Sequence, residues 1–202
     1  MTDTTSTPHP NQSAESGHGR RRARSEKAIL DAAKALIAER GVEGLTVEGV
    51  AARSGVAKTT IYRRWRDKDE LALAILVDTT EKISAPPDLG DTREELLTFV
   101  KTAKRIIKPG GVVTGLVSDI ATKPRLSRIY REQIVDRRLA EVKTVIDRGI
   151  ARGDFRPDTD VRVAHELLVG PLFYRLLFSG APLTASHAKQ VVDAVMRAFA
   201  PA

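Results

Sequence analysis

The segment TVEGVAARSGVAKTTIYRRW, which ends at Trp65, limits the possible folds of this chain more than any other. Thr46 is a residue type that caps helices, and apolar residues recur at helical spacing over residues 47–54. Gly55 then permits a sharp turn, and a second helical pattern runs from about Ala57 to Trp65. Two short helices joined by so tight a turn predict a helix-turn-helix unit.

The second of these helices has two chemically different faces. Ile61 and Trp65 are four residues apart and share the apolar face, because an α-helix has about 3.6 residues per turn. Thr59, Thr60 and Arg63 share the opposite face. Their hydroxyl, methyl and guanidinium groups suit base edges and thymine methyls in a major groove of DNA. These three residues are therefore candidates for contacts with bases.

Positive charge is concentrated around the same helix. From Arg53 to Lys68 there are six Lys or Arg residues and one acidic residue, and the whole chain has a formal net charge of +7. Lys58, Tyr62 and Arg64 are placed to contact phosphates along the flanks of the helix. This charge favours a polyanionic partner, above all nucleic acid. An arginine-rich face that is simply solvated on a surface helix is the open alternative.

Helical periodicity also dominates the rest of the chain, in which 42% of residues are hydrophobic and only 4% aromatic. Alternating β-branched runs and hairpin turns are missing, so we predict an all-α fold. Ser25 is expected to cap the first helix, and Pro86 and Pro87 are expected to mark a linker. The expected helices cover residues 25–40, 47–54, 57–65, 67–83, 91–108, 112–122, 126–152, 158 or 160 to 180, and 185–200.

Three regions follow from this pattern. Residues 1–19 are polar and without apolar periodicity, so we expect a disordered tail. Residues 20–67 are predicted to form the helix-turn-helix DNA-binding domain together with a basic arm. Arg22 and Arg24 of this arm are candidate DNA contacts, because basic arms can reach along a duplex. Residues 68–202 are predicted to form a second helical domain.

Several kinds of chemistry lack the residues that they need. The chain has no cysteine, which excludes disulfides, thiolate metal sites and a cysteine nucleophile. The four histidines show no convincing metal-ligand spacing, and no phosphate-binding glycine loop or serine-hydrolase motif is present. No apolar run of about 18 residues occurs. We therefore expect a soluble cytoplasmic protein that is not an enzyme, binds no metal or cofactor and does not span a membrane.

The residues from Arg24 to Leu76 resemble the tetracycline-repressor (TetR) family of bacterial transcription regulators. The family pattern appears here as LIAERGVEGLTVEGVAARSGVAKTTIYRRWRDKDEL. The resemblance implies that Trp65 anchors the recognition helix, and Ala57 stands where a capping serine is common in the family. It implies DNA contacts by Thr46, Lys58, Thr59, Thr60, Tyr62, Arg63 and Lys68.

The C-terminal half resembles an actinobacterial subgroup of the same family through the pattern RGDFRPDTDVRVAHELLVGPLFYRLLFSGAPL. By this resemblance, the last two long helices form a four-helix dimer interface with their symmetry mates. The candidate interface residues are Leu168, Leu172, Val191 and Val195. A place in the core of a single chain is the alternative for each of them. Gly170 and Pro171 are expected to kink or locally break the penultimate helix.

The resemblance also implies a small-molecule effector, which would bind in an apolar cavity among the C-terminal helices. The candidate lining residues are Phe99, Leu116, Ile120, Tyr130 and Phe173, and plain core packing is the alternative for each. Glu166 beside His165 is a candidate for recognising a cationic effector, with an exposed helix pair as the alternative.

The function implied by the resemblance is that of a homodimeric repressor, which binds a palindromic double-stranded DNA operator and is released by its effector. Two other functions stay open. One is a dimeric regulator that responds to no ligand, and the other is a nonspecific nucleoid-type DNA-binding protein.

Overall fold

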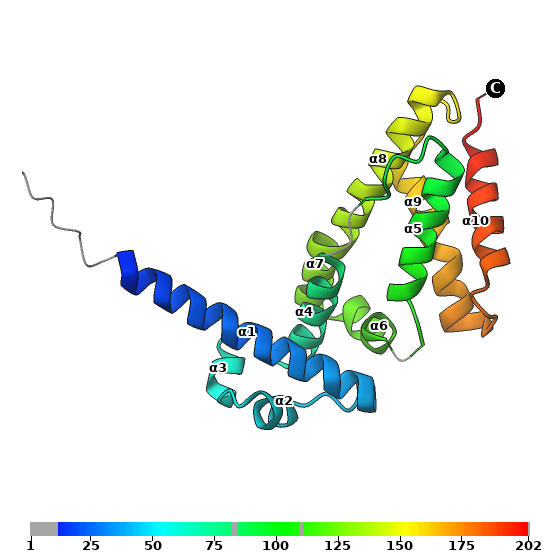
Figure 1. The fold of residues 1–202 in the computed structure, drawn as a ribbon. Coiled ribbons are helices and arrows are strands. Elements are labelled where there is room, and N and C mark those ends of the chain that lie inside the picture. Colours follow the sequence, from blue (N-terminus) through cyan, green and yellow to red (C-terminus); the bar gives the residue numbers. More distant parts are fainter. Residues whose placement is uncertain (1–11, 82–84, 110, 202) are drawn as a thin grey trace, which may run out of the picture.

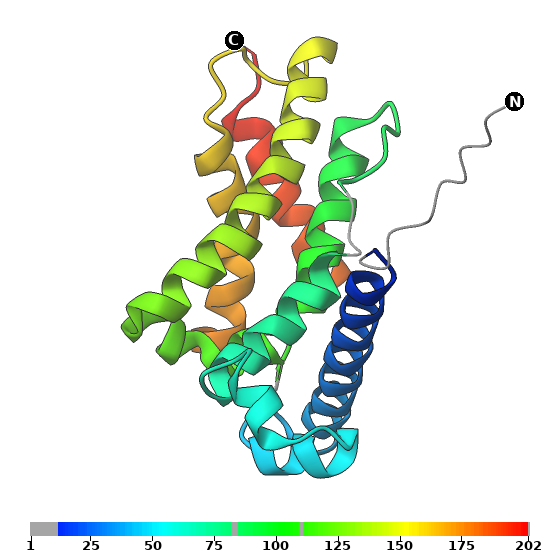
Figure 2. The ribbon, with the colours of Figure 1, turned by 90° about the vertical axis from the view of Figure 1, so that its left-hand side faces the viewer.

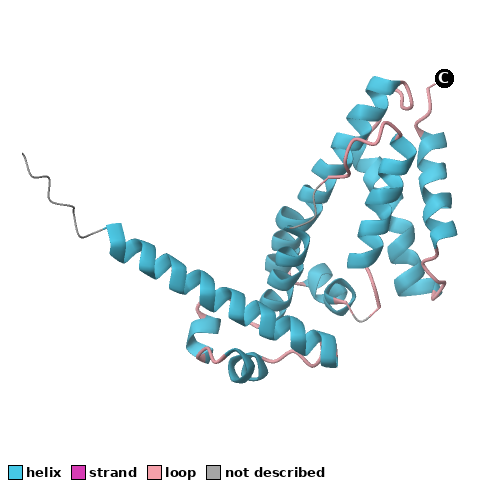
Figure 3. Cartoon of the chain, viewed as in Figure 1, coloured by secondary structure: helices cyan, strands magenta, loops and turns pink. Residues whose placement is uncertain are grey.

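The computed structural model describes residues 12–81, 85–109 and 111–201, and of residues 12–18 it describes the backbone alone. Every regular element in these ranges is a helix, as Figure 3 shows. The predicted all-α fold, with an N-terminal helix-turn-helix domain followed by a helical domain, is confirmed. The elements are α1 (Gln12–Arg40), α2 (Val47–Ser54), α3 (Lys58–Tyr62), α4 (Lys68–Glu81), α5 (Thr92–Ile106), α6 (Val112–Thr122), α7 (Pro124–Tyr130), the π-helix η1 (Arg131–Val135), α8 (Asp136–Arg152), α9 (Val161–Tyr174), the π-helix η2 (Arg175–Ser179) and α10 (Ala185–Ala198).

Helix α1 begins earlier than the sequence pattern indicates. It includes residues 12–19, so this part of the segment predicted to be disordered is helical, and residues 1–11 lie outside the described residues. The sequence has no proline between Pro10 and Pro86, and the arginines and alanines before residue 25 are good helix formers. Ser25 does not cap the helix, because its hydroxyl donates to the carbonyl oxygen of Arg22 inside α1.

Most of the other expected helix ends are confirmed. Gly41 and Gly55 have φ values of 70° and 69°, the left-handed conformation that ends a helix. Asp91 accepts a hydrogen bond from the backbone N–H of Glu94 at the start of α5, and Thr184 caps α10 in the same way. Of the two acidic residues considered as the cap of α9, Asp160 occupies the position.

The long helix expected over residues 126–152 is present as a continuous run of α7, η1 and α8 that begins at Pro124. Proline suits the first helical turn, because its missing N–H would have no partner there. Helix α9 passes through Pro171 without interruption, and the helix changes to the π form only at Arg175, where η2 begins.

The buried apolar side chains form two clusters. The first cluster joins α1, α2 and α3 to α4, α6, α7 and η1, so the core has no gap at the predicted domain boundary after residue 67. The second cluster lies among α5, α8, α9 and α10. Phe173 packs against both clusters. Figures 1 and 2 show α2 and α3 at one end of the molecule, with the C-terminal end of α10 at the opposite end.

Candidate nucleic-acid interface and ligand cavity

The turn between α2 and α3 is built by local hydrogen bonds. At the start of α2, the Thr46 hydroxyl accepts from the backbone N–H of Gly49 at 3.0 Å, which is the cap that the sequence predicts. After Gly55, the Ser54 hydroxyl accepts from the backbone N–H of Val56 at 3.2 Å. Ala57 precedes α3 without any side-chain cap. The turn therefore fixes the direction in which α3 leaves α2.

Helix α3 is attached to the core by its apolar face. Ile61 is fully buried and Trp65 is 9% exposed, and both belong to the core cluster that includes α1 and α2. On the opposite side Thr59 and Arg63 are exposed and Thr60 is half-buried. The polar face therefore points away from the interior, as the sequence predicts.

The regular part of α3 is shorter than the predicted span of residues 57–65, since it ends at Tyr62. The backbone N–H groups of Arg64 and Trp65 both reach the carbonyl oxygen of Ile61, at 2.9 and 3.0 Å. A hydrogen bond to a residue three positions earlier tightens the last turn of a helix. This tight turn carries Trp65 back into the core.

The candidate phosphate contacts differ in their surroundings. Tyr62 is exposed on the flank of α3, and Lys68 is exposed at the first position of α4. Lys58 is also exposed, and its ammonium group lies 2.9 Å from a carboxylate oxygen of Glu48 in α2. A DNA phosphate would therefore compete with Glu48 for Lys58, at small cost because an ion pair in water is weak.

Arg64 does not lie in the position predicted for a phosphate contact. Its Nη2 donates to the carbonyl oxygen of Arg22 at 2.8 Å and to the Ser25 hydroxyl at 3.0 Å, and its side chain is only 10% exposed. Glu26 lies 3.9 Å from Nη1. Arg64 therefore joins the turn after α3 to α1. The sequence pattern alone predicts an exposed charge at this position.

The arginines of the predicted arm are part of helix α1. Arg22 and Arg24 are exposed on its N-terminal half, which Figure 1 shows extending beyond α3. The arm is therefore a helical extension of α1. Arg64 joins it to the turn after α3 through hydrogen bonds to Arg22 and Ser25.

The first turn of α4 connects this surface to the rest of the molecule. Asp67 accepts hydrogen bonds from the backbone N–H groups of Asp69 and Glu70, at 3.0 and 2.9 Å. Asp69 also pairs with Lys123 at the end of α6, and Glu70 pairs with Arg125 in α7. Burial disfavours the charged form of Glu70, yet hydrogen bonds from Arg125 and from the backbone N–H of Arg66 hold the pKa of its carboxyl group below the ordinary value.

A cavity of about 320 Å³ lies between α5, α6, α7, η1, α8 and α9. This volume is at the lower end of the range of roughly 300–1,000 Å³ found for small-molecule sites. Of the five predicted lining residues, Ile120, Tyr130 and Phe173 line the cavity. Phe99 and Leu116 are buried and do not line it. Phe99 packs instead beneath Arg138, whose guanidinium carbon is 4.3 Å from the ring centre.

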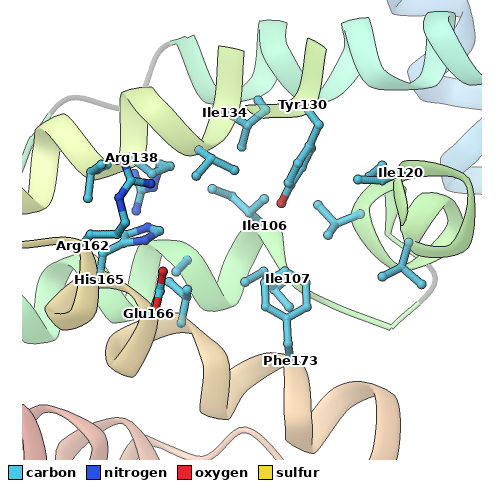
Figure 4. Close-up of a pocket in the computed structure, with 16 residues that line it drawn as sticks. Ile106, Ile107, Ile120, Tyr130, Ile134, Arg138, Arg162, His165, Glu166 and Phe173 are labelled. Atoms are coloured by element: carbon cyan, nitrogen blue, oxygen red, sulfur yellow. The ribbon is translucent and has the colours of Figure 1, made fainter. Parts of the chain in front are cut away.

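One end of the cavity carries polar groups. Figure 4 shows Arg138, Arg162, His165 and Glu166 together at this end, while Ile120 and Phe173 lie toward the other. Burial, together with the charges of Arg138 and Arg162, lowers the pKa of His165 to about 4, so its imidazole is neutral at pH 7. Burial alone raises the pKa of the Tyr130 hydroxyl.

Arg138 is one of the charged cavity residues that the sequence pattern did not identify, together with Arg162. It stands midway between Ile134 and Val142, each four residues away and buried on the same face of the helix. An arginine within an apolar stripe of this spacing is the signal that could have identified it. The residue is 6% exposed and pairs with the buried Glu141.

For the four candidate dimer residues, the structure agrees with the alternative, a place in the core of a single chain. Each of them is buried in the second core cluster of the single chain, so none is available to a second copy. The spacing of apolar residues correctly identified the face of each helix that packs inward. The four candidates on these faces are Leu168, Leu172, Val191 and Val195.

The described residues contain neither a membrane-spanning helix nor a group of metal ligands. No helix there has the length and the apolar character required to cross a membrane. Within the same ranges, no three histidine, aspartate or glutamate side chains are grouped so that they could hold a metal ion.

Comparison with known proteins agrees with this architecture. The family description "Bacterial regulatory proteins, tetR family" matches residues 29–75, and "Tetracyclin repressor-like, C-terminal domain" matches residues 86–195. The HTH-type transcriptional regulator YdeS of Bacillus subtilis (strain 168) is 31% identical over 177 residues, which cover 87% of this chain and 88% of YdeS. The DNA-binding transcriptional repressor TetR of Mycobacteroides abscessus is 27% identical over 172 residues, covering 84% of this chain and 90% of that protein.

A solved structure shows the same fold. The TetR family transcription regulator SCO0332 superimposes with a TM-score of 0.74 at 31% sequence identity, and the match covers 88% of this chain and 99% of that one. The family descriptions together span both helical regions, and the relatives match nearly the whole length. This chain therefore belongs to the TetR family of transcriptional regulators.

Proposed function

We propose that this regulator is a homodimeric repressor, which binds a palindromic operator through α3 and is released when a small molecule enters the cavity. The observation that carries the proposal is the position of α3. Its apolar side is fixed in the core by Ile61 and Trp65, while Thr59 and Arg63 are exposed beside a concentration of basic residues. In a two-fold dimer, two such helices would enter successive major grooves about 34–36 Å apart.

The outer side of α9 and η2 supports the homodimer. Val163, Leu167, Tyr174 and Phe178 are exposed apolar or aromatic residues on this run, with Tyr174 62% and Phe178 77% exposed. They recur at intervals of four, seven and four residues, so they form one stripe along the helix. This stripe, rather than the buried residues named from the sequence, is the candidate contact with a second copy.

The position of the cavity supports regulation by a ligand. Helix α6 forms part of its wall through Val113, Val117 and Ile120. The same helix ends beside Lys123, which pairs with Asp69 in the first turn of α4. A ligand that displaces α6 would therefore act on the helix that directly follows the recognition region. A coupling of about 1–3 kcal/mol is typical of such regulation.

The test is to select binding sites for the purified full-length protein from random DNA duplexes. The expected result is an inverted repeat, bound by two copies and more weakly as salt rises. A Leu167→Glu variant should bind more weakly and sediment as a monomer, whereas Leu89→Glu, an exposed leucine in the segment before α5, should do neither. Equal affinity for random DNA would support the nucleoid-type alternative, and binding to a single half-site by a monomer would refute the dimer.

A further inference from the structure

We propose that the cavity binds a small amphipathic anion, a carboxylate on an apolar body, with the carboxylate held at the Arg138 end. The proposal specifies the effector class of the function proposed above and rests on that function only for its regulatory meaning. The binding itself is a separate property of the cavity.

The cavity wall is divided by polarity. Apart from Tyr130, the residues that line it away from the Arg138 end are aliphatic or phenyl side chains, such as Ile106, Ile120 and Phe173. A wall of this kind favours an apolar ligand body, since burying apolar surface is favourable in proportion to its area. A molecule of uniform polarity would therefore leave one end of the cavity poorly matched.

Arg138 has an unused hydrogen-bonding group. Its Nη1 pairs with Glu141, while the buried Nη2 has no hydrogen-bond partner among the described residues. A buried donor without a partner reduces stability, and a ligand oxygen that accepts from it would recover this loss on binding. A carboxylate is the acceptor that best matches a guanidinium, because the bond is assisted by charge and its geometry is planar.

The surrounding charges favour an anion over a cation. Among the residues that line the cavity, Arg138 and Arg162 are positive and Glu166 is negative, which leaves an excess of one positive charge. Glu141 does not line the cavity and pairs with Arg138. His165 adds no charge at pH 7, because burial lowers its pKa to about 4, but its neutral ring can still form a hydrogen bond. An ammonium group placed here would lie near two arginines of the cavity wall. Glu166 alone therefore does not make this a site for a cationic effector.

The test is isothermal titration calorimetry on the full-length protein without DNA. The probes are three matched series, in which a hexyl, a decyl or a phenylbutyl body carries a carboxylate, a hydroxyl or an ammonium group. In at least one series the carboxylate should bind roughly tenfold more tightly than the other two. Equal or tighter binding of the amine or the alcohol in every series, or no binding at all, would overturn the proposal.

Two variants test whether Arg138 causes the preference for a carboxylate. The double variant Arg138→Met with Glu141→Leu avoids leaving Glu141 buried without its partner, and thermal unfolding checks that it folds. It should bind the carboxylate no better than the alcohol. Arg105→Met, which removes an exposed arginine of α5, should keep the preference for the carboxylate. If the double variant kept that preference, or failed to fold while Arg138→Gln, which removes the charge, bound the carboxylate as tightly as the unchanged protein, Arg138 would not be the anchor.

The outcomes for binding and regulation can be told apart. A carboxylate that binds without releasing operator DNA would contradict the proposed release and leave the ligand class intact. Release of DNA by the amine or the alcohol alone would support the regulation and refute the ligand class.

Discussion

Lys123, at the C-terminal end of α6, places its ammonium nitrogen 2.6 Å from a carboxylate oxygen of Asp69 in the first turn of α4. This contact joins two parts of the chain that are 54 residues apart. Asp69 follows directly after the candidate phosphate contact Lys68, and α6 forms part of the cavity wall. The pair is therefore one of the contacts that join the cavity wall to the helix that follows the helix-turn-helix.

A double-mutant cycle of Asp69→Asn and Lys123→Met tests this connection. Asp69 is mostly buried, but Lys123 is half exposed, so solvent screens the pair. We expect a coupling of about 0.5–1 kcal/mol in the free energy of unfolding. Lys101→Met, at an exposed position of α5, is the control and should show no coupling with Asp69→Asn. A coupling of zero for the Lys123 pair would show that the contact does not hold α4 to α6.

Replacing Arg64 should reduce stability more than it changes the salt dependence of DNA binding. The variant Arg64→Met loses the hydrogen bonds to the Arg22 carbonyl and the Ser25 hydroxyl. We expect a loss of roughly 1.5–3 kcal/mol in unfolding free energy, because the donor is charged. Calorimetric unfolding and operator binding at several salt concentrations measure the two effects.

Arg66→Met is the matched control for this variant, since the Arg66 side chain is exposed two residues further along the chain. It should leave the unfolding temperature nearly unchanged. If Arg64 contacted a phosphate directly, its replacement would lower the salt slope of binding by about one. A stable Arg64→Met protein with such a reduced slope would restore the role predicted from the sequence.

The candidate DNA contacts in α3 and just after it should separate into two classes by their effect on DNA recognition. Tyr62→Phe and Lys68→Ala should weaken binding to all sequences by similar factors, because phosphates carry no sequence information. Thr60→Ala and Arg63→Ala should instead change which bases are tolerated, with a cost of roughly 1–3 kcal/mol for a lost base contact. Binding to a set of single-base operator variants measures both. The opposite assignment of the two pairs would mean that α3 meets the groove with a different face.

The sequence identified the recognition region well because local rules decide it. Thr46 determines a helix cap, and Gly55 determines a turn. The four-residue spacing of Ile61 and Trp65 determines a buried face. None of these features depends on distant residues. The same reasoning could not place Arg64. Its partners in α1 are 39 and 42 residues away, and only the tertiary fold brings them together.

The C-terminal domain was predicted less well for a related reason. Apolar periodicity identifies the inward face of a helix, but it does not distinguish a dimer contact from the core of one chain. Leu168 and Val195 therefore appeared as dimer candidates, although they are buried. Likewise, Phe99 and Tyr130 look equivalent in the sequence, but in the structure the cavity residues Arg138 and His165 contact the Phe99 ring, which does not itself line the cavity.

His165 should make the protein less stable in mild acid. The folded protein keeps its imidazole neutral down to about pH 4, whereas the unfolded chain binds the proton near pH 6.5. Stability from this residue is therefore fully present above pH 6.5 and is lost as the pH falls toward 4, by up to about 3 kcal/mol. Urea unfolding of the unchanged protein and of His165→Gln across this range measures the effect. The two curves should converge in acid, and parallel curves would contradict the prediction.

Gly115 is expected to set how closely α6 approaches the DNA-binding region. A Cβ atom at this position would lie 2.8 Å from the Cβ of Val42, which is buried in the turn between α1 and α2. In Gly115→Ala, this overlap should cost roughly 1–3 kcal/mol. The better helix propensity of alanine returns about 1 kcal/mol of that loss. The net effect should be a lower unfolding temperature, by roughly 2–4 °C for each kcal/mol lost.

Gly19→Ala in α1 is the control, because no atom lies within 4 Å of its added Cβ. If Gly115→Ala instead raised the unfolding temperature as much as Gly19→Ala, α6 would move away from Val42 at no cost, and this contact could then not transmit a displacement of α6 to the recognition helix.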